Sequence, residues 1–142
     1  MVLDHDPEMI SMLESRGTPY TYGDASDPDL LEDLKIPHAE LVISTVPDLE
    51  TNLIILSAAK QKENPPTVMV LAHRITNALE LYDAGADYVI LPHFLGGTYA
   101  ASLVRRYAKE AVDLHDIRDK HIDHLRTRMS NGQEHPEIDR LR

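Results

Sequence analysis

Short apolar runs alternate with longer amphipathic stretches along the first two thirds of the chain. Apolar runs of strand length lie at residues 1–3, 18–22, 41–44, 67–71 and 88–91. The stretches between them carry leucine, isoleucine or methionine at helical spacing. Strands that alternate with helices in this way predict an α/β fold with a parallel sheet, right-handed crossovers and helices on both faces.

Helix ends are marked by residues that suit them. Asp6 and Asp27 each stand before a proline, and Asp48 precedes an apolar periodic stretch, so all three are predicted N-caps. Gly17 and Gly85 are expected to end helices. The unbroken apolar run at 41–44 is typical of a buried parallel strand.

Position within a helix predicts whether three particular side chains are buried or exposed. In the helix expected over residues 76–83, Leu79 and Tyr82 are predicted to face inward. In the helix that follows Asp48, Asn52 is predicted to be a surface position rather than a binding residue.

The last third of the chain has a different pattern. Residues 98–129 predict a long helical region, continuous or once broken, as an extension of a domain at 1–97. Its apolar stripe is longer than a small sheet can cover, so the far half is expected to pack on another subunit in a dimer. Residues 130–142 are polar and predict a disordered tail.

Composition narrows the classes of function. The chain has 142 residues, with 14 Lys and Arg against 24 Asp and Glu, and a net charge of −10. Such a charge disfavours binding to nucleic acid and to anionic membrane surfaces. There is no cysteine, no signal-peptide pattern and no apolar run of membrane-spanning length, so we expect a cytoplasmic domain that does not insert into a membrane.

Candidate binding residues follow four of the predicted strands: Asp4, Gly23, Asp24, Ala25, Thr45, Asp48, His73 and Arg74. Ligands of open parallel sheets lie beyond the carboxyl ends of the strands, so these residues are expected to border one crevice. Asp4 stands where an acidic residue accepts hydrogen bonds from ribose hydroxyls, although a simple turn residue is the alternative.

Each of the other candidate residues has a possible binding role and a purely structural alternative. Gly23 permits close backbone approach and Asp24 offers a carboxylate to adenine or ribose, or else Asp24 merely begins a helix. Thr45 has a hydroxyl for phosphate or nicotinamide, whereas the charge of Asp48 disfavours phosphate. Arg74 suits a phosphate and His73 titrates near neutral pH, or both are solvated.

Sequence patterns for catalysis are missing. The chain has no Gly-rich strand–loop–helix, and the spacing of Gly96 and Gly97 fits no phosphate loop. Neither a nucleophile elbow nor a readable triad is present. His121 and His124 have metal-compatible spacing, but a solvated helix face explains them better. The sequence therefore predicts neither an enzyme nor a metal site.

Several stretches together resemble the TrkA-N domain, also called the RCK or KTN domain, over about residues 1–110. They lie at residues 2–8 (VLDHDPE), 22–28 (YGDASDP), 44–52 (STVPDLETN) and 81–92 (LYDAGADYVILP). Residues 92–97 (PHFLGG) are most similar to antiporter-linked members. The resemblance implies a cytosolic, dimeric, Rossmann-like domain that binds NAD(H), AMP or ATP and regulates a membrane-embedded potassium or cation:proton transporter in the same or a separate chain.

The resemblance also assigns roles and exposes a gap. It implies that Asp4 is the ribose-binding acid, that Asp24 and Ala25 belong to the adenine-side loop, and that residues 45–48 and 73–74 are the next two crevice loops. The family's first strand, Gly-rich loop and first helix have no counterpart, so the domain is truncated at its N-terminal side. A slot with open edges is expected between the strands at 1–3 and 41–44. A remnant of an NAD-dependent dehydrogenase and a non-binding assembly module are the alternatives.

Overall fold

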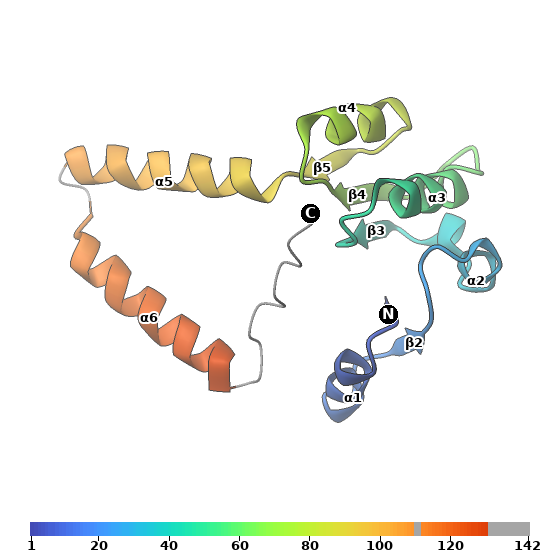
Figure 1. Cartoon of the computed structure of the whole chain (residues 1–142), viewed down its shortest axis with the longest axis horizontal. Helices are drawn as coiled ribbons and strands as arrows, with labels where there is room; N and C mark the ends of the chain where they lie inside the picture. Colours follow the sequence, from blue (N-terminus) through green and yellow to red (C-terminus); the bar gives the residue numbers. More distant parts are fainter. Residues whose placement is uncertain (110–111, 131–142) are drawn as a thin grey trace, which may run out of the picture. The chain divides into compact units, whose positions relative to one another are not determined.

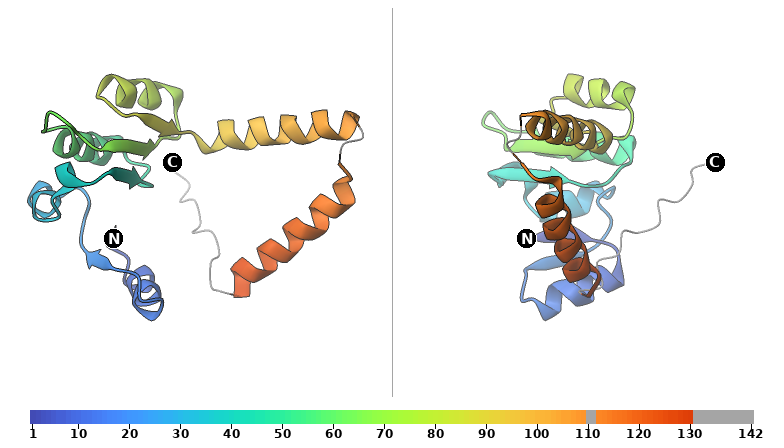
Figure 2. Two further views of the ribbon diagram at one scale, coloured as in Figure 1. Left: turned by 180° about the vertical axis from the view of Figure 1, so that it is seen from behind. Right: turned by 90° about the vertical axis from the view of Figure 1, so that its left-hand side faces the viewer.

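The strands form two parallel sheets. The computed structural model describes residues 1–109 and 112–130, with β1 at Val2–Asp4, β2 at Tyr20–Tyr22, β3 at Leu41–Ser44, β4 at Thr67–Leu71 and β5 at Tyr88–Ile90. β1 pairs with β2, and a separate sheet has the order β3-β4-β5 (Figures 1 and 2). All three pairings are parallel, which confirms the predicted α/β class.

Three of the first four helices begin where the sequence predicted, and the fourth begins one residue earlier. They are α1 at Pro7–Ser15, α2 at Pro28–Asp33, α3 at Leu49–Ala59 and α4 at Ile75–Asp83, with a short 3₁₀ turn, η1, at Ile36–His38. Side chains of Asp6, Asp27 and Asp48 each accept a backbone N–H of the first turn, so the predicted caps are confirmed. Gly17 and Gly85, which follow α1 and α4, have positive φ values of 64° and 101°.

The main core lies between the three-stranded sheet and the helices α3 and α4. Leu56, Val68, Val70, Leu81 and Val89 are all buried there. These side chains come from alternate positions of β4, from the middle of β5 and from the inner faces of the two helices, as period-2 and period-3.6 patterns require.

An ion pair lies at the amino-terminal ends of β4 and β5. Lys60 Nζ lies 2.8 Å from Asp87 Oδ2 and also donates to the carbonyl of Pro66 at 3.2 Å. The same Asp87 oxygen accepts the Val68 N–H at 2.7 Å. The pKa of Asp87 lies below its ordinary value because its carboxylate accepts hydrogen bonds from the Lys60 ammonium and the Val68 N–H and is attracted by the positive charge of Lys60.

Two predictions about burial are wrong. Leu41 and Ile43 are 50% and 55% exposed, so β3 is covered on one face rather than two. In α4, Leu79 and Tyr82 are exposed, and the buried positions are Ala78 and Leu81. The inward stripe of α4 lies one position earlier than predicted, and helical spacing alone could not separate the two, because Ala78 and Leu81 are three positions apart just as Leu79 and Tyr82 are.

Two further helices end the described chain: α5 at Pro92–Ala108 and α6 at Leu114–Ser130. The chain divides into two compact units, Met1–Leu95 and Gly96–Arg142. No residue of α5 or α6 is buried. The helical region thus starts earlier than residue 98 and includes Gly96 and Gly97. Of the tail predicted at 130–142, Ser130 is the last residue of α6, and residues 131–142 lie outside the described residues.

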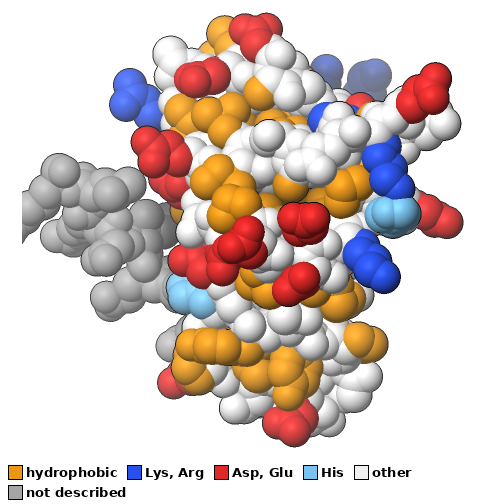
Figure 3. All heavy atoms as spheres, turned by 90° about the vertical axis from the view of Figure 1, so that its right-hand side faces the viewer, with side chains coloured by type: hydrophobic (Ala, Val, Ile, Leu, Met, Phe, Trp, Pro, Cys, Tyr) orange, Lys and Arg blue, Asp and Glu red, His pale blue; other side chains and the backbone are white. Residues whose placement is uncertain are grey.

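The exposed surface carries acidic and apolar groups side by side. On the face in Figure 3, hydrophobic side chains reach the surface between aspartates and glutamates. Within residues 1–109 and 112–130, no helix combines the length and the apolar character needed to cross a bilayer.

Candidate functional site

A cavity of about 610 Å³ lies between β1 and β3, where the two sheets fail to meet. We call it the β1–β3 cavity. Its lining consists of residues 1–4, Ala25, Leu31, Leu34, Ile36, Ala39, residues 41–46 and Ile55. The slot expected between these strands is therefore present. Most of its lining is apolar, and no lysine, arginine or histidine is part of it.

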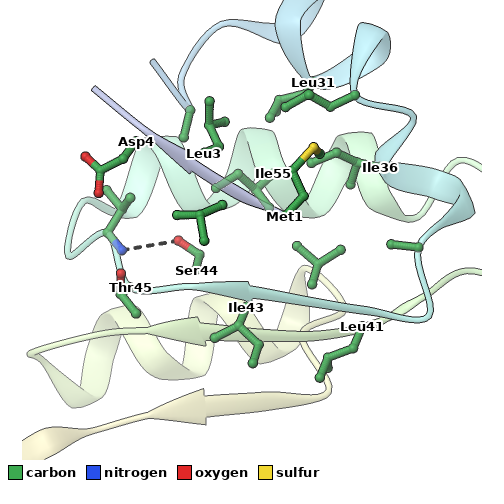
Figure 4. A pocket seen from close by; sticks show the side chains of 16 residues that line it. Met1, Leu3, Asp4, Leu31, Ile36, Leu41, Ile43, Ser44, Thr45 and Ile55 are labelled. Carbon is green, nitrogen blue, oxygen red and sulfur yellow. Dashed lines mark hydrogen bonds between the residues drawn. The ribbon is translucent and has the colours of Figure 1, made fainter. Parts of the chain in front are cut away.

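The cavity brings together some predicted site residues and leaves others out. Asp4, Ala25 and Thr45 all line it, from the carboxyl ends of β1, β2 and β3. Figure 4 shows Asp4 and Thr45 at the same end of the cavity, and Met1 and Leu41 toward the opposite end. The remaining candidates follow strand ends as well, but none of them lines the cavity: Gly23, Asp24, Asp48, His73 and Arg74.

The loop after β1 uses Asp4 partly for its own structure. Asp4 Oδ1 accepts the Asp6 N–H at 2.9 Å, so the turn reading of this residue is correct as far as that oxygen is concerned. The side chain is half-buried at the cavity, and no hydrogen bond to its second carboxylate oxygen, Oδ2, is found within the described chain. That oxygen has the chemistry to accept a hydrogen bond from a ribose hydroxyl.

The loop after β2 is held by local hydrogen bonds and close packing. The Gly23 N–H donates to the Asp4 carbonyl at 3.0 Å, and a Cβ at Gly23 would lie 2.4 Å from Leu30 Cδ2. Asp24 Oδ1 accepts the Ser26 N–H at 2.8 Å. Hydrogen bonds from the Ser26 backbone and hydroxyl, with a smaller contribution from His5, lower the pKa of Asp24.

Close packing against Leu30 of α2 therefore explains a glycine at position 23. Asp24 remains exposed and ionised at neutral pH.

The loop after β3 ends in a tightly engaged cap. Asp48 Oδ2 accepts both the N–H and the hydroxyl of Thr51, each at 2.8 Å. These two bonds lower the pKa of Asp48. Thr45 is exposed at the cavity mouth, next to Ser44, whose hydroxyl accepts the Val46 N–H at 3.3 Å. Asp48 thus serves the helix, whereas Thr45 lines the cavity.

Asn52 is the residue whose importance the sequence analysis missed. Its side chain is fully buried, at 0% exposure, so the predicted surface position is wrong. Asn52 Nδ2 donates to the carbonyls of Val46 at 2.8 Å and Leu71 at 3.1 Å. One amide therefore ties the loop after β3 to the carboxyl end of β4. Its spacing of three and four positions from Ile55 and Leu56, which places all three on one helix face, was the available signal.

The loop after β4 is open. His73 and Arg74 are exposed, and Arg74 is the N-cap residue of α4 but makes no side-chain capping bond. The rings of His73 and His93 lie 6.3 Å apart and tilted by 52°. His121 and His124 are exposed on α6, and the described residues contain no group of three or more ligands that fits a metal ion.

Taken together, parallel strands flanked by helices, with the loops after β1, β2 and β3 bordering one cavity, define a Rossmann-like fold. The sequence model of the TrkA-N domain family matches residues 1–92. That stretch is well over half of the chain, and the protein therefore belongs to the TrkA-N domain family.

Relatives agree with this assignment. The glutathione-regulated potassium-efflux system protein KefC of Escherichia coli O139:H28 is 33% identical over 87 residues, which are 61% of this chain and 14% of KefC. The TrkA-N domain of the inner membrane protein ybaL from Escherichia coli has a TM-score of 0.65 at 18% identity, over 72% of this chain and 76% of that domain.

A third similar structure is a channel. The GsuK channel bound to NAD has a TM-score of 0.52 at 20% identity, over 78% of this chain and 24% of the channel chain; GsuK has also been solved bound to ADP. The structural matches support the fold. The match with KefC spans only a small part of that protein's length.

Proposed function

We propose that this chain is a nucleotide-sensing regulatory domain of a potassium or cation transport system, in particular a monovalent cation:proton antiporter. Family membership and the similarity to KefC, a potassium-efflux protein, support the transport assignment. The observation that carries the sensing role is the convergence of Asp4, Ala25 and Thr45 on the β1–β3 cavity at the strands' carboxyl ends.

The cavity suits the nucleoside side of such a ligand. Its apolar walls accept a flat base, and Asp4 provides a carboxylate oxygen for ribose hydroxyls. Because no basic side chain lines the cavity, phosphate groups gain little there. Arg74, on the loop after the neighbouring strand, is the cation we assign to them, with His73 beside it.

NAD(H) or an adenine nucleotide such as AMP or ATP fits this description, and the GsuK structures with NAD and ADP favour the same class. The ligand acts as a signal in this proposal, and no reaction is assigned to the domain. Its partner is a membrane-embedded cation transporter domain at the inner face of the membrane, in the same or a separate polypeptide, so the domain itself is cytoplasmic.

A homodimer is part of the proposal. No residue of α5 or α6 is buried, and both helices present large apolar side chains, among them Tyr99, Val104 and Leu125. An exposed apolar stripe of this kind is suited to a second subunit.

Calorimetric titration of the 142-residue chain with NADH, NAD, AMP and ATP, extended to millimolar concentrations, tests the sensing role. We expect at least one of them to bind, and Asp4→Asn to weaken that binding about tenfold, equivalent to ~1.4 kcal/mol. Asparagine keeps the acceptor for the Asp6 N–H, so the loop is preserved.

Asp29→Asn, at an exposed acidic residue on α2, removes the same charge and is the matched control. If none of the four ligands binds, a non-binding assembly module replaces this proposal. Hydride transfer between NAD and a small alcohol would instead favour a dehydrogenase remnant.

A further inference from the structure

A second cavity, of about 760 Å³, lies where α2 packs against α3 (Figure 1). We call it the α2–α3 cavity. Its volume is in the range of small-molecule sites. Apolar side chains from both helices line one part of it, among them Leu31 and Ile54, and three side chains with nitrogen donors line another part: Lys35, His38 and Lys62.

These three side chains lie near the amino-terminal ends of two strands. Lys35 and His38 come shortly before β3, and Lys62 follows α3 and comes before β4. Asp4 and Thr45, by contrast, line the β1–β3 cavity from the carboxyl ends of β1 and β3. The α2–α3 cavity is therefore a different site from the one to which we assign a nucleotide.

Hydrogen-bond donors outnumber acceptors in this cluster. Lys62 Nζ lies 2.6 Å from Nε2 and 2.9 Å from Nδ1 of His38. An ammonium can only donate, so the imidazole accepts through its unprotonated nitrogen and keeps the N–H of the other nitrogen as a donor. The Lys62 ammonium has further N–H groups as well. Both side chains are exposed, and these donors can therefore reach a ligand.

The positive charges of Lys35 and Lys62 are not compensated within residues 1–109 and 112–130. Ion pairs in those ranges join Lys60 to Asp87 and arginines of α6 to aspartates of the same helix. Lysines near a helix end are often explained by bonds to its last carbonyls, but neither side chain makes such a bond there. The cluster thus creates a local positive potential on a chain of net charge −10.

Two carboxylates line the same cavity. Asp29 and Glu32 lie on α2, and neither forms an ion pair with Lys35 or Lys62. Like charges repel, so these carboxylates disfavour an anion beside the first turns of α2. The carboxyl end of α2, where Lys35 lies, is the favoured position for one.

The backbone of Lys35 is in an unusual conformation. Its φ of 54° and ψ of 42° are left-handed, and among the described residues it is the only non-glycine with a positive φ. It follows the end of α2, where glycine or asparagine normally adopts this conformation. Lysine has a Cβ that crowds the backbone there, so it costs free energy that glycine would not. A residue that is retained despite strain indicates a role for its side chain.

A phosphate monoester matches this arrangement of charges and donors. Near pH 7 it carries a charge of about −1.5 to −2 and three acceptor oxygens. Lys35 and Lys62 provide two positive charges, and together with His38 they provide three donor side chains. A carboxylate has one charge and two oxygens, and it would leave one lysine without compensation.

We propose that the α2–α3 cavity binds a small phosphate monoester with an apolar substituent. Lys35, His38 and Lys62 donate hydrogen bonds to the phosphate oxygens, and the apolar substituent contacts Leu31 and Ile54. Binding is noncovalent, and no reaction is assigned to the site. The inference does not depend on nucleotide binding in the β1–β3 cavity.

An NMR titration of the 142-residue chain with phenyl phosphate, at constant ionic strength, tests the site residue by residue. We expect saturable shifts of the Lys35, His38 and Lys62 signals at millimolar phenyl phosphate. Inorganic phosphate should bind more weakly because it lacks the apolar group. Benzyl alcohol, which has the ring but no charge, should leave these signals unchanged.

Lys35→Gly separates ligand binding from folding. Glycine relieves the left-handed strain, so the urea midpoint of unfolding should rise. The affinity for phenyl phosphate should nevertheless fall about threefold to fivefold, because one exposed charge contact is lost. A purely structural lysine would not produce these two opposite changes.

Further variants test the charges one at a time. Lys62→Gln should weaken binding about as much as Lys35→Gly, and the double variant should weaken it about tenfold or more. Glu32→Gln should strengthen binding, since it removes a like charge from the cavity lining. Lys120→Gln makes the same change in charge at an exposed position of α6 and should have no effect.

Four results would overturn the proposal. One is the absence of saturable shifts, and another is a set of shifts confined to Thr45 and Arg74, since the probe would then occupy the nucleotide crevice. The third is benzoate binding as tightly as phenyl phosphate, which would contradict recognition of a phosphate. The fourth is equal weakening by Lys62→Gln and Lys120→Gln, which would show that only the net charge of the chain matters.

Discussion

Replacing Asn52 is the most direct test of how the site loops are held. Its amide group donates two hydrogen bonds, to the carbonyls of Val46 and Leu71, while Oδ1 is buried and has no partner among the described residues. The side chain therefore stabilises through its donors and carries a cost through its acceptor. Substitutions that separate donor from acceptor have predictable and different effects.

Asn52→Leu keeps the size but removes both polar groups. Losing two neutral hydrogen bonds costs about 2 kcal/mol, and two carbonyls lose their donors. Removing the unpartnered Oδ1 returns about 1 kcal/mol. We expect a net loss of about 1–2 kcal/mol in the free energy of unfolding.

Asn52→Asp is also close in size but replaces the donor by a carboxylate oxygen. That oxygen would face two carbonyl oxygens at hydrogen-bonding distance in a buried site. Breaking a buried arrangement so that a charge lacks compensation costs about 3–5 kcal/mol. The aspartate variant should therefore be clearly less stable than the leucine variant at pH 7.

The pH dependence has a definite sign. Burial and the facing carbonyls raise the folded-state pKa of the introduced carboxyl above its unfolded value of about 3.9. Its destabilisation grows by about 1.4 kcal/mol per pH unit between those two values and is relieved as pH falls. The difference between the aspartate and leucine variants should thus narrow from pH 7 to pH 5.

Urea denaturation followed by far-UV circular dichroism measures both effects, with the unsubstituted chain at each pH as reference. An aspartate variant within about 0.5 kcal/mol of the unsubstituted chain at pH 7 would refute the reasoning, because scatter of that size is typical of surface substitutions. A gap that widens toward pH 5 would refute it equally.

Three further substitutions probe the scaffold, each checked by urea denaturation. Asp48→Ala should cost about 1 kcal/mol, because both hydrogen bonds from Thr51 at the start of α3 are lost; Asp48→Asn should recover most of it. Lys60→Met should cost about 1 kcal/mol at pH 7, since the pair with Asp87 is partly exposed at 24% and 45%.

The folded-state pKa of Asp87 is lowered, so the stabilisation by its ion pair with Lys60 is complete above the ordinary pKa of 3.8 and is lost as the pH falls below that value. The loss of stability caused by Lys60→Met should therefore shrink at low pH. A loss that grows at low pH would contradict the pairing. Gly23→Val should destabilise by about 1–3 kcal/mol through overpacking against Leu30, and Gly23→Val combined with Leu30→Ala should regain part of that loss. Additive effects in that double variant would show that the two side chains do not meet.

Local sequence determined the elements of this domain. Aspartate before proline favours a helix start at residues 6 and 27, since the cap and the fixed φ act within one turn. The parallel arrangement also followed from sequence, because strand–helix alternation leaves few other folds. The positions of Asp4, Ala25 and Thr45 around one cavity were anticipated for the same reason: carboxyl ends of parallel strands share an edge.

Tertiary structure decided burial. Asn52 was expected at the surface, but its environment depends on the Val46 loop and on Leu71, which is 19 positions away. Leu41 and Ile43 have the sequence of a strand covered on both faces, and yet they are exposed. Whether a side chain is buried depends on which other segments pack against it, and the residues of the strand alone do not determine which segments do so.

The lining of the β1–β3 cavity is a further example: the family resemblance predicted a slot between these strands, but only the folded chain shows that Leu31, Leu34 and Ile55 border it.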